Sequence, residues 1–140
     1  MSTDVVVYVL TALAGVVVVL TRLRVRADGG AGQHRVSSPV LAVHTVAGGL
    51  AVVVWVVFLA FPEDSAPGHP VVGIVALALW WVVALDGLLV LLRWLPTRGR
   101  HAVEASAATW SNGPGLSVLA HLGMVVAVLV FTWVYLTSAV

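Results

Sequence analysis

Four long apolar stretches, separated by shorter polar segments, dominate the pattern of this chain. They cover about residues 5–23, 39–61, 70–95 and 115–137. Each is close to the roughly 20 residues that a helix needs to cross the hydrocarbon core of a bilayer. The pattern therefore predicts an all-α integral membrane protein, in which residues 1–140 form a single four-helix bundle with up-and-down topology.

Composition supports this class. Hydrophobic residues make up 61% of the 140 residues and charged residues only 9%, and the mean hydropathy is +1.08. These values exclude an ordinary soluble domain. The chain has no cysteine, which removes disulfides and thiolate metal sites. It also lacks a phosphate-binding loop, a nucleotide fingerprint and a nucleic-acid-binding pattern. Any chemistry is therefore expected within the lipid bilayer or at its edge.

The arginines predict the orientation of the bundle. All seven basic residues are arginines, and they lie within residues 22–35 and 93–100, at and beyond the ends of the first and third spans. Because positive residues are enriched in cytoplasmic loops, we expect both of these connections in the cytoplasm and both termini outside. The first span lacks the flanks of a cleaved signal peptide, so we expect it to be retained. The bias to Arg, Ala and Val is typical of a high-GC bacterium, which indicates the inner (plasma) membrane.

Two histidines interrupt otherwise apolar spans. His44 lies in LAVHTVAGG of the second span, and His121 lies in LAHLGMVVA of the fourth. Each follows the start of its helix by about two turns, which places both roughly 8 to 10 Å into the hydrocarbon from the same face. In an up-and-down bundle these two helices are diagonal, so the imidazoles are expected to face each other across the centre. Ionisable residues in a bilayer are costly and usually functional.

Glycines occur at a similar depth on every span. The set comprises Gly15, Gly48, Gly49, Gly87 and Gly123. Such a layer would leave room for a planar group between the helices, and Gly48 shares the face of His44 because it follows by four residues. Small residues also line ordinary contacts between membrane helices, so the layer by itself does not specify a ligand.

Together, these features resemble the bis-histidine haem sites of membrane b-type cytochromes, including the cytochrome b561-like group. The resemblance rests on His44 and His121, with Gly48, Gly49 and Gly123 beside them. It implies one haem b, with both histidines bound to the iron, because the spans offer no second histidine pair near the opposite face. Two histidine ligands leave no open iron position, which implies an electron-transfer protein or oxidoreductase subunit more than a stand-alone enzyme.

Three further charged residues are candidates for the same site. Arg22 and Arg93 end the first and third spans and are suitable partners for haem propionates, although the topology signal alone also explains them. Asp86 lies within the third span near the histidine layer, where a carboxylate needs a partner or a proton. It is expected to accept a hydrogen bond from a ligand histidine or to relay protons to a quinone.

Two other classes of function stay open on the sequence. In one, His44, Asp86 and His121 bind a divalent metal directly, or carry protons, in a transporter. In the other, the protein is a structural or assembly subunit whose polar side chains bond to one another and hold the helices in register. For the cytochrome, the expected partners are quinone, a redox subunit or a second copy of the chain.

Overall fold

The computed structural model contains four α-helices in the part of the chain that it describes, which is residues 2–27, 38–94 and 114–138. The helices are α1 (Thr3–Ala27), α2 (Ser38–Ala60), α3 (Pro70–Trp94) and α4 (Pro114–Leu136). Each contains a segment of 19 to 22 residues that is long and apolar enough to cross a membrane, and no strand occurs among the described residues. The prediction of an all-α, four-helix membrane protein is confirmed.

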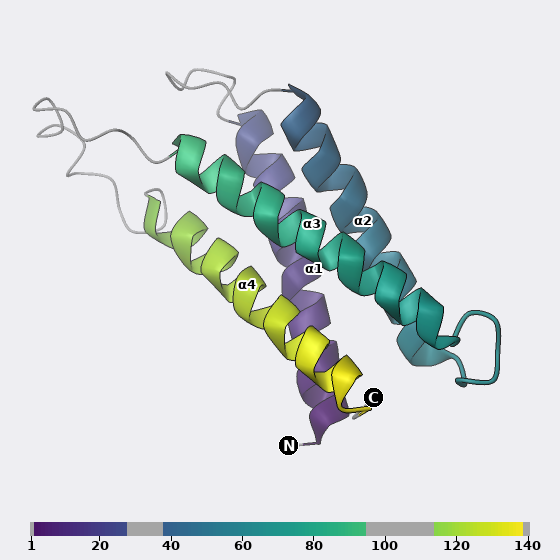
Figure 1. Cartoon of the computed structure of the whole chain (residues 1–140). Coiled ribbons are helices and arrows are strands. Elements are labelled where there is room, and N and C mark those ends of the chain that lie inside the picture. The colour runs from purple at the N-terminus through teal and green to yellow at the C-terminus, as the bar shows by residue number, and fades with distance from the viewer. Residues whose placement is uncertain (1, 28–37, 95–113, 139–140) are drawn as a thin grey trace, which may run out of the picture.

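The helices form an up-and-down bundle (Figure 1). Each helix packs against its two neighbours around the bundle, with α2 against α3 as the most extensive contact, whereas α1 and α3 lie diagonally, as do α2 and α4. Both chain ends lie at one end of the bundle, together with the connection from α2 to α3. We call this the termini end, and the opposite end, which carries Arg22 at the last turns of α1, the arginine end.

Local sequence explains where the helices begin. Pro70 and Pro114 are the first residues of α3 and α4, and Pro39 is the second residue of α2. Proline suits a first turn because its missing N–H would have no partner there, and its fixed φ is already helical. Asp4 lies in the first turn of α1, where a carboxylate interacts favourably with the helix dipole.

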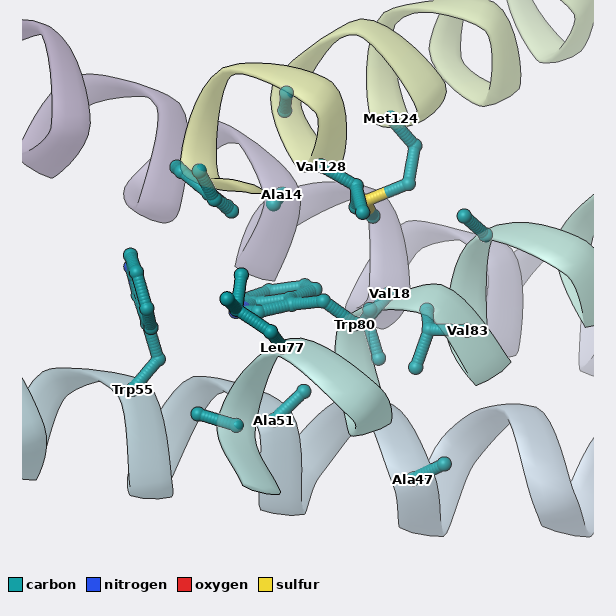
Figure 2. Close-up of a cluster of buried hydrophobic side chains, with 14 of the residues drawn as sticks. Ala14, Val18, Ala47, Ala51, Trp55, Leu77, Trp80, Val83, Met124 and Val128 are labelled. Atoms are coloured by element: carbon teal, nitrogen blue, oxygen red, sulfur yellow. The ribbon is translucent and has the colours of Figure 1, made fainter. Parts of the chain in front are cut away.

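The core of the bundle combines alanines with large aromatic residues (Figure 2). Trp55, Trp80 and Phe131 are fully buried, and the ring centroids of Trp55 and Trp80 lie 5.1 and 5.6 Å from that of Phe131. Ala51 and Ala76 are fully buried as well and allow the helices to approach closely. Large apolar side chains cover the outside of all four helices, as expected for a surface in contact with lipid.

Few polar side chains are buried inside this apolar shell. Among the described residues, they are Thr11, His44 and His121. Thr11 donates from its hydroxyl to the carbonyl of Val7 at 2.7 Å and accepts from the indole N–H of Trp55 at 3.2 Å. Thr11 is therefore satisfied by its own neighbours, and the two histidines require a separate explanation.

Candidate functional site

The two intramembrane histidines meet in the centre of the bundle. His44 of α2 is 1% exposed and His121 of α4 is 6% exposed. Although their helices are diagonal, their imidazole centroids are only 6.4 Å apart, with the ring planes inclined by 35°. The side chains therefore span the middle of the bundle, where no backbone of α2 approaches that of α4.

The depth of this pair follows from where the two helices begin. His44 is six residues after Ser38, the first residue of α2, and His121 is seven residues after Pro114, the first residue of α4. Both helices start at the arginine end, so a rise of 1.5 Å per residue places both rings about 9 to 11 Å from it. The histidines consequently share one level in the half of the bundle nearer the arginine end.

Gly87 of α3 lies directly beside both rings. A Cβ atom added to Gly87 would lie 2.8 Å from Cδ2 and 3.5 Å from Nε2 of His121, and 3.4 Å from Cε1 of His44. These atoms are the Cδ2–Nε2 edge of His121 and the Cε1 atom of His44. Both rings therefore lie against one place on α3, at a residue without a side chain.

Asp86 precedes Gly87 and approaches the Nδ1 atom of the His44 ring. Its Oδ2 lies 3.6 Å from Nδ1 of His44, slightly beyond hydrogen-bond length, and its side chain is 12% exposed. Nε2 of His44 is fully buried and has no hydrogen-bond partner among the described residues. A carboxylate on the Nδ1 side favours a proton on that nitrogen and leaves the lone pair on Nε2 for a ligand.

The separation of the rings fits one metal atom between them. Metal–imidazole bonds are about 2 Å long and each nitrogen lies roughly 1 Å from its ring centroid, so a metal with two opposed imidazoles separates the centroids by about 6 Å. The observed distance is 6.4 Å. An iron atom that already has four porphyrin nitrogens needs only two further ligands.

A metal ion held only by side chains is a poorer fit. Within the described residues, no group of three or more His, Asp or Glu side chains is arranged to hold a metal ion. Asp86 lies beside Nδ1 of His44. Direct binding of a metal ion by His44, Asp86 and His121 stays an open alternative.

The predicted layer of glycines is only partly at the site. Gly87 touches the histidines, and Gly48 is buried against α1, where an added Cβ would lie 2.7 Å from Val18. Gly15 is half-buried, and its Cβ would make an ordinary contact with α2 at 3.7 Å. Gly49 and Gly123 are exposed on the outside of the bundle, where a Cβ would meet nothing within 4 Å. These two glycines therefore do not line the space between the histidines.

The two arginines that were predicted as partners of haem propionates differ in what the structure describes of them. Arg22 lies half-buried near the end of α1 at the arginine end. Arg93 belongs to the last turn of α3, but its side chain lies outside the described residues. Their role towards a propionate stays a prediction.

Two polar contacts inside the bundle were not singled out from the sequence. These are the hydrogen bonds from Trp55 to Thr11 and from Trp81 to Thr132, both 3.2 Å long and both between helices. A threonine in the middle of an apolar span is the signal that could have indicated them, because its hydroxyl oxygen can accept a hydrogen bond from an indole N–H of a neighbouring helix. They belong to the half of the bundle beyond the histidine layer and lock α1 to α2 and α3 to α4.

Chemically, the centre of the bundle offers two neighbouring imidazoles, a carboxylate beside one of them and an apolar shell. Imidazoles at this centroid separation could both bind one metal atom if their nitrogens face it. Comparisons with protein-family models, curated proteins and solved structures found no match for this chain.

Proposed function

We propose that this protein is a membrane b-type cytochrome that binds one haem between His44 of α2 and His121 of α4. The observation that carries the proposal is the 6.4 Å separation of two buried imidazoles across the bundle, close to the roughly 6 Å expected for two axial ligands of one iron.

The neighbours of the pair support this assignment. Gly87 supplies a surface without a side chain next to both ring tips, and Asp86 lies 3.6 Å from Nδ1 of His44, where it would orient that ring. When bound, haem would supply reversible one-electron transfer, and two histidine ligands would leave no open position for oxygen. The role of the protein is to hold the two rings in line and to exclude water.

The proposal also places the electron exchange in the membrane. The histidine layer lies nearer the arginine end of the bundle, and the arginine-rich connections favour a cytoplasmic location for that end. Arg22 is the described cation available to a haem propionate there. A quinone or a redox subunit on this side would exchange electrons with the haem, in the plasma membrane of a bacterium.

The test is the haem content of purified protein expressed with adequate haem supply. We expect one haem per chain in the wild type and loss of most haem in His44→Gly and in His121→Gly. The matched control is His69→Gly, because His69 is exposed in the connection between α2 and α3 at the termini end. Added imidazole is expected to restore haem to the His44→Gly and His121→Gly proteins by filling the vacated ligand position.

Two results would contradict the proposal. One is a wild type that stays colourless after haem is supplied during expression and again after purification. The other is haem binding that is equally strong in the wild type and in both histidine variants, since the haem would then be held elsewhere or not specifically.

A further inference from the structure

A cavity that is separate from the histidine site lies at the termini end of the bundle. Its volume is about 770 Å³, within the range of small-molecule sites, and all four helices contribute to its lining. It is formed where the first turns of α1 and α3 and the last turns of α2 and α4 meet, together with the connection between α2 and α3. The proposed cytochrome function makes no use of it.

Aromatic side chains form much of the wall of this cavity. They are Tyr8, Phe58, Phe61 and Tyr135. The ring centroids of Phe58 and Tyr135 are 5.9 Å apart, and the phenol O–H of Tyr135 donates to the carbonyl of Pro70 at 2.8 Å. This hydrogen bond ties α4 to α3 and holds the Tyr135 ring in place.

Two glycines allow close packing around the cavity. Gly73 of α3 is buried behind its wall, and a Cβ there would lie 2.5 Å from Tyr135 and 3.0 Å from Phe58. Gly68 is buried in the connection and lines the cavity, and a Cβ there would collide with the backbone carbonyls of Phe61 and Pro62. The rings of Phe58 and Tyr135 can therefore lie against α3 because Gly73 has no side chain, and the connection can turn tightly because Gly68 has none.

The charged residues that line the cavity, within the described part of the chain, are acidic. Asp4 of α1 and Glu63 of the connection are both part of its lining, and both are exposed. Among the described residues, no arginine lines it. Exposed carboxylates carry negative charge at neutral pH, and the faces of aromatic rings also attract cations. Carboxylates and aromatic faces thus favour the same class of ligand, and the aromatic rings also offer apolar surface to the substituents of such a ligand.

We propose that this cavity binds a lipophilic organic cation, of the quaternary ammonium or phosphonium class. The cationic centre would lie among the aromatic rings near Asp4 and Glu63, and its apolar substituents would contact Phe58, Phe61 and the ring of Tyr135. The site is independent of haem, because it lies at the end of the bundle opposite to the histidine layer.

The probe for this site is tetraphenylphosphonium, and its control is tetraphenylborate, which has nearly the same size and shape but the opposite charge. Binding of each ion is measured separately by equilibrium dialysis against the purified full chain in a neutral detergent, with protein-free micelles as the blank. We expect saturable binding of one phosphonium ion per chain and no saturable binding of the borate.

Carboxylate variants locate the ion. Asp4→Asn and Glu63→Gln are each expected to weaken phosphonium binding about threefold, and the double variant about tenfold, since exposed charges act through solvent. Asp64→Asn is the matched control, because Asp64 is exposed in the same connection but does not line the cavity. It is expected to change the affinity less than twofold. Circular dichroism verifies that each variant keeps its helices.

The outcomes are distinguishable. Selective phosphonium binding that weakens in the Asp4 and Glu63 variants and not in Asp64→Asn supports the site. Absence of saturable binding, equal binding of both tetraphenyl ions, or equal affinity in all the variants would overturn it. His121→Gly is expected to bind the phosphonium normally, so failure of the haem proposal and failure of this one can be told apart.

Discussion

Replacing Gly87 by alanine tests the contact between α3 and the histidine pair. The added Cβ would lie 2.8 Å from Cδ2 of His121, whereas ordinary van der Waals contact begins near 3.4 Å. The His121 ring or α3 would therefore have to move by roughly 0.6 Å. Because the ring is 6% exposed and packed among neighbours, this movement disturbs the alignment of the two imidazoles.

The expected size of the effect follows from overpacking. Inserting a methyl group into a packed interior costs about 1 to 3 kcal/mol, which corresponds to a roughly five- to hundredfold change in the unfolding equilibrium. Against this cost, alanine gains about 0.5 to 1 kcal/mol over glycine in a helix interior. We therefore expect Gly87→Ala to be destabilised by about 0.5 to 2 kcal/mol net, and its haem occupancy to fall.

Two other glycines provide the controls. A Cβ at Gly49 or at Gly123 would meet nothing within 4 Å, so the alanine variants gain helix propensity without a clash. We expect both to be as stable as the wild type or more stable by up to about 1 kcal/mol. The assay is reversible unfolding of the detergent-solubilised apoprotein by titration with sodium dodecyl sulfate, followed by circular dichroism.

The order of stability of the three alanine variants decides the outcome. We expect Gly87→Ala to unfold at a lower mole fraction of dodecyl sulfate than Gly49→Ala or Gly123→Ala. If Gly87→Ala were as stable as Gly123→Ala, α3 would not lie against His121 as the structure has it, and the reasoning about the site would fail.

Three further predictions concern single contacts. Thr11→Val and Trp55→Phe each remove the buried interhelical hydrogen bond, so each should lower the free energy of unfolding by about 1 kcal/mol. In a double-mutant cycle of unfolding, the coupling energy should be about 0.5 kcal/mol or more, and additive effects would refute the bond. Tyr135→Phe should cost about 1 kcal/mol in the same unfolding assay, because it leaves the carbonyl of Pro70 without this donor; an unchanged unfolding midpoint would count against it. Asp86→Leu should retain haem but raise the midpoint potential of the haem by tens of millivolts in a redox titration. The reason is that a carboxylate beside Nδ1 makes the His44 ligand more electron-donating. An unchanged potential would show that Asp86 does not act on the His44 ligand.

The sequence alone predicted the number, type and limits of the helices well. The second, third and fourth spans agree with α2, α3 and α4 to within one residue at each end, because proline and polar residues border the apolar runs sharply. The first helix continues to Ala27, four residues beyond its predicted end. The length of an apolar run indicates how much of a helix lies in the hydrocarbon core, whereas arginine and alanine, which are good helix formers, extend α1 past it.

The rotation of each helix could not be predicted in the same way. The spans are apolar on all sides, because lipid and core both accept such residues, so the pattern does not distinguish inside from outside. Gly49 and Gly123 were expected in the layer around the histidines but face outwards. Gly48 is buried, as His44 is, because a spacing of four residues needs no knowledge of rotation, but it packs against Val18 of α1.

Contacts between residues that are far apart in the chain could not be predicted from the sequence either. The depth of His44 and His121 and the diagonal placement of their helices were predicted from chain order. Their 6.4 Å separation, the approach of Gly87 and the position of Asp86 behind His44 depend on how side chains interlock across the bundle. The cavity at the termini end likewise depends on which aromatic rings meet there.

The central claim is that two buried imidazoles hold one haem, and a reduced-minus-oxidised visible spectrum of the purified wild type tests it most directly. With haem supplied during expression, the account predicts the spectrum of a low-spin, six-coordinate b-type haem, with one haem per chain. A protein without these bands, or one whose haem is five-coordinate and binds carbon monoxide on reduction, would contradict axial ligation by both His44 and His121.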